Sequence, residues 1–221
     1  MTFKPSDVAD PRSGTMEENI FEESGSPKRL ETLRTIFDNP PYGKDMEWTG
    51  YTVCDAASLL LRYLLQLPEP VIPADFGDRF CSPLKGPHIQ AVEEHKTQIP
   101  SVSDFDIDAV TREYRKLVNE LSPLNRHLLL YLLDVLAVFI SFQKQHRLTM
   151  SKLTALFQPG ILGNESPSTA EDCRLRQDVL VFLIYHRDSF LVEIESTETS
   201  WRDRLSGYVS EAAKVLVYLE E

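Results

Sequence analysis

Histidine is the residue type in this sequence with the clearest potential for metal chemistry. His88 and His95 are seven positions apart with Glu94 beside them, so a helix would place both imidazoles on one face. No third ligand is apparent, and solvated histidines are the simpler interpretation. The sequence also has no G-x-x-x-x-G-K-[ST], G-x-G-x-x-G or H-E-x-x-H pattern, so we expect no metal, no cofactor and no direct small-molecule substrate.

Three cysteines are the other potentially reactive groups. Cys54, Cys81 and Cys173 are widely spaced and form no C-x-x-C pair, which is typical of reduced thiols in a cytosolic protein. A cysteine nucleophile activated by a histidine is conceivable in any chain that has both, but no local motif supports one here. We interpret the three thiols as small buried hydrophobic residues.

The charge of the chain is strongly acidic. Among 221 residues, 34 acidic and 23 basic side chains give a formal net charge of −11. Such a surface repels a phosphate backbone, so we expect no nucleic-acid partner. Four of the acids, Glu17, Glu18, Glu22 and Glu23, lie close together near the start of the chain, and we interpret this stretch as a solvated acidic segment.

No segment has the features of a signal peptide or of a membrane span. The first residues lack an apolar core, and the longest apolar stretch, residues 128–142, is interrupted by Asp134. We expect a cytoplasmic protein with no membrane span.

The hydrophobic pattern places these residues on helices. Apolar residues recur at intervals of three and four, and no segment alternates with the period of two that is typical of strands. The helices predicted from this pattern span residues 26–37, 53–67, 71–80, 87–99, 106–121, 123–144, 149–157, 170–187 and 201–219. The sequence therefore predicts an all-α fold.

Capping residues and prolines predict where several helices begin and end. Thr52 with Asp55, and Ser168 with Glu171, have the spacing of a capping box, in which each side chain bonds the other residue's backbone amide. Pro159, followed by glycine, predicts the end of the helix that starts near residue 149.

Composition divides the chain into three parts. Residues 1–18 contain prolines, a glycine and several acids without an apolar period, so we expect a flexible leader. The helical region spans 19–192. Residues 193–221 are predicted to form a polar linker and a C-terminal amphipathic helix, which starts near Trp201.

Four segments together resemble a known family. They are N-I-F-E-E-S-G-S at 19–26, A-S-L-L-L-R-Y-L-L-Q-L-P-E-P-V-I-P at 57–73, L-S-P-L-N at 121–125 and L-T-M-S-K-L-T-A-L-F-Q-P-G-I-L at 148–162. In order and spacing they resemble the RhoGAP domain, a helical module that stimulates GTP hydrolysis by Rho-family small GTPases. The resemblance covers about residues 19–192, and it implies a RhoGAP-like helical bundle with a Rho-family small GTPase as partner.

The resemblance also implies a mechanism. A RhoGAP domain inserts an arginine from a G-I-F-R-x-S-G-S loop beside the transferring phosphoryl group, where it neutralises developing negative charge. Glu22 stands at the matching position of this sequence. An arginine finger accelerates hydrolysis about 10³- to 10⁵-fold, so a carboxylate there predicts weak activity or none.

Other positions also depart from the family pattern. Leu61 and Leu65 fall where the family places basic or polar residues, and Lys152 falls where an asparagine is common. The two leucines are either buried in a reused helix or exposed as a small apolar patch on the GTPase-facing surface. Arg29, just after the loop, is a possible substitute cation, but its helical position favours a structural ion pair. Together with Glu22 and Pro159, these residues are our candidates for the GTPase-facing surface.

We therefore predict a RhoGAP-domain protein that binds a Rho-family GTPase with weak or no activating activity. No catalytic residue is assigned, because Glu22 occupies the finger position, and the chain is predicted to be a regulator and not an enzyme. Two alternatives stay open. One is an active GTPase activator that uses another residue, and the other is a helical scaffold that no longer binds GTPases.

Overall fold

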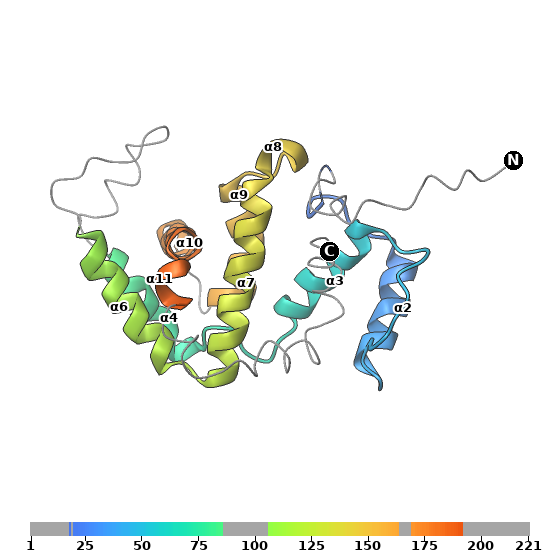
Figure 1. The fold of residues 1–221 in the computed structure, drawn as a ribbon, viewed down its shortest axis with the longest axis horizontal. Coiled ribbons are helices and arrows are strands. Elements are labelled where there is room, and N and C mark those ends of the chain that lie inside the picture. Colours follow the sequence, from blue (N-terminus) through green and yellow to red (C-terminus); the bar gives the residue numbers. More distant parts are fainter. Residues whose placement is uncertain (1–17, 19, 86–105, 164–168, 192–221) are drawn as a thin grey trace, which may run out of the picture. The chain divides into compact units, whose positions relative to one another are not determined.

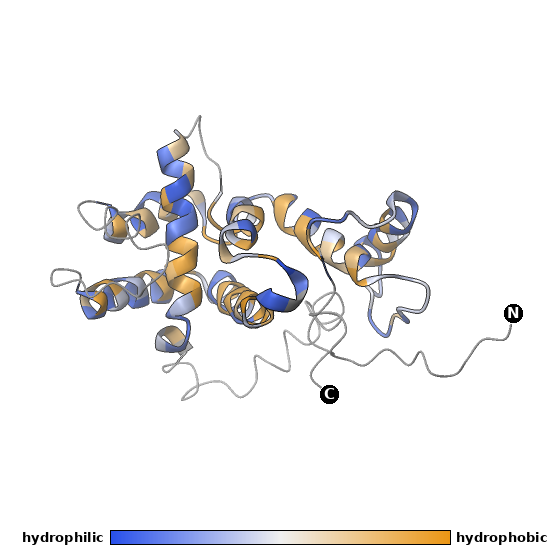
Figure 2. Ribbon diagram, turned by 90° about the horizontal axis from the view of Figure 1, so that it is seen from above, coloured by the Kyte–Doolittle hydropathy of each residue, from blue (hydrophilic) through white to orange (hydrophobic). Residues whose placement is uncertain are grey.

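The computed structural model describes residues 18, 20–85, 106–163 and 169–191 (Figure 1). Within these ranges the regular elements are helices, which confirms the all-α prediction. Hydrophobic and hydrophilic segments alternate along most of the helices (Figure 2). The predicted leader before residue 18, the helix over 87–99 with His88 and His95, and the C-terminal segment 193–221 lie outside the described residues.

The described residues contain the following helices in chain order. They are α2 (Pro27–Asp38), α3 (Val53–Leu65), α4 (Ala74–Cys81), the 3-10 turn η1 (Ser82–Leu84), α6 (Ile107–Glu120), α7 (Pro123–Ser141), α8 (Gln143–His146), α9 (Met150–Leu162), α10 (Ala170–Tyr185) and α11 (Asp188–Leu191). The described residues divide between two compact units, the first drawn from 1–63 and 138–153 and the second from 64–137 and 154–196.

In the first unit, α3 begins at the predicted capping box. The backbone amide of Asp55 donates to Thr52 Oγ1 at 3.2 Å, and the Thr52 amide donates to Asp55 Oδ2 at 2.8 Å. Both bonds satisfy amides that have no partner inside the helix, so the box fixes where α3 starts. α3 then buries Ala56, Ala57, Leu59 and Leu60.

In the second unit, α6 packs against α4, η1 and α11. The buried Tyr114 of α6 donates its hydroxyl to the Phe80 carbonyl oxygen at 2.9 Å, and its ring lies 5.1 Å from that of Phe182 in α10. Arg115 Nε donates to the Ser189 carbonyl oxygen at 3.0 Å, which fixes α11 against α6. The three-four stripe of α6 thus forms a core, as predicted.

The apolar helix α7 ends at Ser141, earlier than the predicted residue 144, and a separate short helix, α8, follows it. Among the described residues, α7 is the single helix whose length and composition would allow it to cross a membrane. Interior helices of folded domains have the same composition, and α7 buries Leu129, Leu133 and Leu136 completely.

The prediction that Pro159 ends its helix is wrong, because α9 continues through it to Leu162. The helix is supported beyond the proline by hydrogen bonds from outside it. The backbone amides of Val71 and Ile72 donate to the carbonyl oxygens of Gly160 and Ile161 at 3.1 and 2.8 Å. α4 starts at Ala74 and not at the predicted residue 71, because Pro73 disfavours helical backbone at the residue before it, Ile72.

The second capping box lies one residue later than predicted. Thr169 Oγ1 accepts the Asp172 amide at 3.2 Å, and Asp172 Oδ2 accepts the Thr169 amide at 3.1 Å, so α10 begins at Ala170. The hydrogen bonds from Thr169 lower the pKa of Asp172.

A methyl group added at Gly160 is expected to destabilise the second unit. Its Cβ would lie 2.9 Å from Leu64 Cβ and 3.2 Å from the Leu64 carbonyl carbon. Overpacking costs about 1–3 kcal/mol, of which the better helix propensity of alanine offsets up to about 1 kcal/mol. We expect Gly160→Ala to lower the free energy of unfolding by about 1 kcal/mol in urea titrations. Unchanged or increased stability would contradict this close approach.

Candidate functional site

The candidate site is built around residues 20–26, which we call the finger loop because they include the position that the family resemblance assigns to the catalytic arginine. The loop is anchored at its start by two apolar side chains. Ile20 is fully buried and Phe21 is 7% exposed, and the Phe21 ring meets the Phe139 ring edge to face at 5.0 Å. Aromatic contacts of this geometry add to the stabilisation from burial, so the backbone before Glu22 is fixed.

The end of the loop is anchored by its backbone. The Gly25 amide donates to Ser58 Oγ at 3.0 Å, and the Ser26 amide donates to Asp55 Oδ1 at 2.8 Å. A Cβ at Gly25 would lie 2.5 Å from that same carboxylate oxygen. Only glycine fits there, so the loop approaches α3 too closely for any side chain at this position.

Asp55 connects the finger loop to two helices. Its fully buried carboxylate accepts hydrogen bonds from Ser26, Arg29 and Thr52, which belong to the loop, to α2 and to the start of α3. Burial alone would raise the pKa of Asp55, but these hydrogen bonds outweigh it and hold the pKa below its usual value. The carboxylate therefore stays ionised and orders the site without facing solvent.

Arg29 forms the structural ion pair that its helical position predicts. Its Nε lies 2.6 Å from Asp55 Oδ2, and its side chain is 40% exposed. Since the guanidinium is bound to a buried carboxylate, moving it toward a partner would leave that charge without its ion-pair partner. This makes Arg29 a poor substitute for a finger arginine.

Glu22 is paired with a lysine from the far part of the chain. Its Oε1 lies 2.5 Å from Lys152 Nζ, and the two side chains are 36% and 55% exposed. Lys152 lies in the first turn of α9, where its amide donates to Thr149 Oγ1 at 3.3 Å. The site therefore places a carboxylate and an ammonium side by side at the finger position.

A second ion pair involves an acidic residue just before the finger loop. Arg147 reaches Glu18 Oε1 at 3.2 Å. The interpretation of the acidic residues as simply solvated is thus wrong for Glu18 and Glu22, because Glu18 pairs with Arg147, just after α8, and Glu22 pairs with Lys152 in the first turn of α9. Glu17 lies outside the described residues.

The other predicted GTPase-facing residues lie on α3 and α9. Leu61 is half-buried, Leu65 is 56% exposed, and Pro159 is half-buried inside α9. Leu65 therefore matches the exposed alternative, and its neighbour Tyr63 is 58% exposed. That these residues contact a GTPase stays a prediction.

Sequence reasoning did not single out His146, which supports the same site. Its Nδ1 accepts the Leu148 amide at 3.0 Å, so Nε2 carries the hydrogen and donates to the Phe139 carbonyl oxygen at 2.6 Å. The fully buried imidazole thus connects the end of α7, which packs on Phe21, to the chain entering α9. No spacing in the sequence indicates this role.

The remaining reactive groups do not form a site in the described part of the chain. Burial raises the pKa of the Cys81 thiol, as expected for a packed cysteine, whereas Cys54 and Cys173 are only half-buried. The described ranges contain no group of three or more side chains that could hold a metal ion.

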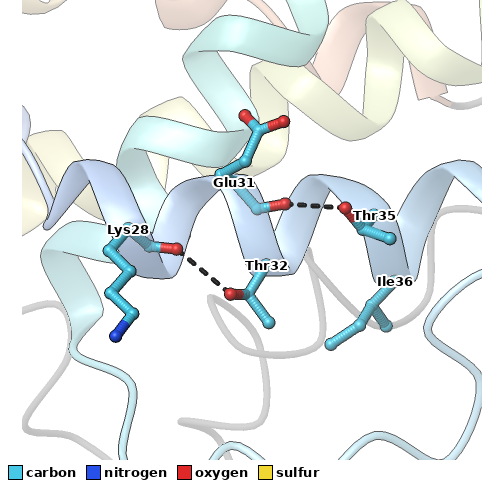
Figure 3. Close-up of a pocket in the computed structure, with 5 residues that line it drawn as sticks. All are labelled: Lys28, Glu31, Thr32, Thr35 and Ile36. Atoms are coloured by element: carbon cyan, nitrogen blue, oxygen red, sulfur yellow. Dashed lines mark hydrogen bonds between the residues drawn. The ribbon is translucent and has the colours of Figure 1, made fainter.

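A shallow hollow on α2 is also not a site, although polar side chains line it together with Ile36 (Figure 3). Its hydroxyls bond within the helix, with Thr32 Oγ1 donating to the Lys28 carbonyl oxygen at 3.1 Å and Thr35 Oγ1 to that of Glu31 at 3.0 Å.

The fold and the site together define a helical domain in which buried residues hold one loop in a fixed position. The family profile of the RhoGAP domain matches residues 11–166 of this sequence. The chain therefore belongs to the RhoGAP domain family, as its four sequence motifs indicate.

Curated relatives and solved structures agree with this assignment. Rho-GTPase-activating protein 5 of Schizosaccharomyces pombe is 36% identical over 185 residues, which are 83% of this chain and 47% of that protein. Rho-GTPase-activating protein BAG7 of Saccharomyces cerevisiae is 34% identical over 190 residues, 84% of this chain and 42% of that protein. The chain thus spans less than half the length of either relative.

Two solved structures share the fold. The BH domain from Graf, described as the GTPase regulator associated with focal adhesion kinase, superposes with a TM-score of 0.61 at 21% identity, covering 82% of this chain and 93% of that one. Human Rho GTPase activating protein 15 superposes with a TM-score of 0.62 at 19% identity, covering 80% and 76%.

These relatives correct one prediction. We expected a regulator that is not an enzyme, but the relatives are named as Rho-GTPase-activating proteins. The expectation that the chain is not an enzyme is therefore wrong.

Proposed function

We propose that this chain binds a Rho-family small GTPase in the cytoplasm and stimulates its GTP hydrolysis more weakly than RhoGAP domains that carry a finger arginine. Membership of the RhoGAP family supports the choice of partner. The single observation that supports weak stimulation is Glu22, a carboxylate on a loop that is fixed at both ends.

Electrostatics gives the expected size of the effect. During hydrolysis negative charge develops on the phosphoryl oxygens, and a finger arginine stabilises that charge by about 4–7 kcal/mol. A carboxylate at the same position has the opposite sign and repels the oxygens. Because the finger loop is anchored by Phe21 and Gly25, it cannot simply retract Glu22 without losing those contacts.

The rate of GTP hydrolysis by a panel of Rho-family GTPases, measured with and without this chain, tests the proposal. Binding is measured in parallel with each GTPase loaded with a non-hydrolysable GTP analogue. We expect binding to at least one GTPase and a stimulation well below about 10³-fold. Absence of binding to every GTPase would overturn the proposal, and so would a stimulation as large as that of an arginine finger.

A further inference from the structure

We infer that Lys152 supplies the cation that a finger arginine would otherwise provide, and that Glu22 weakens it by pairing with it. This inference rests on the proposed function, because it names the residue responsible for the weak stimulation. Its starting observation is the 2.5 Å separation between Lys152 Nζ and Glu22 Oε1.

The position of the ammonium is the main argument. Lys152 Nζ lies within one hydrogen bond of the end of the residue 22 side chain, which is the side chain that the family extends toward the phosphates. A cation from α9 therefore already occupies the region that an arginine at position 22 would reach. Its side chain is 55% exposed, so it is accessible to a partner.

The neighbouring cations fit this role less well. Arg29 is bound to the fully buried Asp55 carboxylate at 2.6 Å. Arg147 pairs with Glu18, which lies four positions before Glu22 and outside the finger loop. Of the basic residues that form ion pairs near the finger loop in the described part of this unit, Lys152 is the one whose partner is residue 22.

Helix stability does not account for a lysine at this place. Positive charge in the first turn of a helix is unfavourable because it faces the positive end of the helix dipole. α9 has no acidic residue of its own in that turn, and Glu22 supplies the compensating negative charge. The carboxylate of Glu22 therefore offsets the unfavourable charge of Lys152, and the ion pair holds the ammonium on the solvent-exposed side of the finger loop.

The pair is also weak enough to open. Both side chains are more than a third exposed, and ion pairs of this kind contribute little because water screens them. The phosphates of bound GTP carry several negative charges and compete for the ammonium against one carboxylate. When water attacks the γ-phosphorus and the bond to the β–γ bridging oxygen breaks, Lys152 would stabilise the charge and transfer no proton.

Four chains test the inference: the unmodified protein, Glu22→Gln, Lys152→Gln and the variant with both changes. Removing the competing carboxylate frees Lys152, so we expect Glu22→Gln to stimulate hydrolysis about fivefold or more above the unmodified chain. Lys152→Gln is expected to lose most of the remaining stimulation, and the double variant is expected to stay as low as Lys152→Gln alone. Lys152→Arg should retain the stimulation.

Lys144→Gln is the matched control, because Lys144 is an exposed lysine on α8 in the same unit, and we expect it to behave as the unmodified chain does. Circular dichroism and thermal unfolding confirm that each variant folds. If Glu22→Gln stimulates GTP hydrolysis equally with and without Lys152, the inference is overturned. Binding of the unmodified chain to the analogue-loaded GTPase would still uphold the proposed function. Loss of binding by the unmodified chain to all GTPases would overturn both.

Discussion

The double variant Glu22→Arg/Lys152→Asn is expected to stimulate GTP hydrolysis at least about 100-fold more strongly than the unmodified chain, since an arginine finger is worth about 10³ to 10⁵. The first change replaces a repelling carboxylate by a guanidinium. The second removes the ammonium that now lies 2.5 Å from the residue 22 side chain and would repel an arginine there. Because the loop is anchored at Phe21 and Gly25, the backbone that carries the new side chain stays in place.

The single variants show whether the two positions act together. Glu22→Arg alone is expected to gain less than the double variant, because its guanidinium would lie close to the Lys152 ammonium at the positive end of α9. Stimulated single-turnover hydrolysis of GTP by the GTPase that binds most tightly provides the measurement. Equal rates for Glu22→Arg with and without Lys152 would show that the two positions do not interact.

A charge-matched control separates this local effect from the change in net charge. Glu31→Arg/Lys28→Asn alters the same charges on the exposed face of α2 that lines the shallow hollow (Figure 3). We expect this control to stimulate hydrolysis as the unmodified chain does. A similar gain in both double variants would mean that long-range attraction to the GTPase, and not the finger position, limits the rate.

Most of the helices could be predicted because their signals are local. The cap of α3 needs only Thr52 and Asp55, which are three residues apart, and the buried stripe of α6 needs only a period of three and four. The cap of α10 was misplaced because Ser168 with Glu171 and Thr169 with Asp172 have the same spacing, one residue apart. Spacing alone does not distinguish two overlapping capping boxes.

The features that were missed depend on distant contacts. α9 continues past Pro159 because the amides of Val71 and Ile72, almost ninety residues earlier, bond to its last turn. In the same way the motif places Glu22 at the finger position, but its partner Lys152 is 130 residues away. A family resemblance therefore identifies the position, whereas the charge that faces it is visible only in the folded chain.

Removing the Asp55 carboxylate is expected to cause the largest loss of stability of any change at the site. Asp55→Ala removes the α3 cap and leaves the Ser26 amide and Arg29 without their shared acceptor. A lost cap costs about 1 kcal/mol and the hydrogen bond from the Ser26 amide about 1.5–3, whereas the 40% exposed Arg29 adds little because water screens it, so we expect the free energy of unfolding to fall by about 3 kcal/mol. Asp55→Asn should cost nearly as much, because its amide NH₂ would face backbone and guanidinium donors. Urea unfolding at pH 7 measures both.

The same carboxylate gives stability a defined dependence on pH. The folded pKa of Asp55 is lowered, so its contribution is fully present above the unfolded value, about 3.9, and is lost as pH falls below that value. The difference in unfolding free energy between the unmodified chain and Asp55→Asn should therefore shrink as pH falls from about 5 to 3. Asp38→Asn is the control, because Asp38 forms an exposed pair with Arg34 at 3.2 Å and should leave the curve nearly unchanged. A constant difference across this range would show that Asp55 stabilises the fold through packing alone and that its charge does not hold the finger loop to α3.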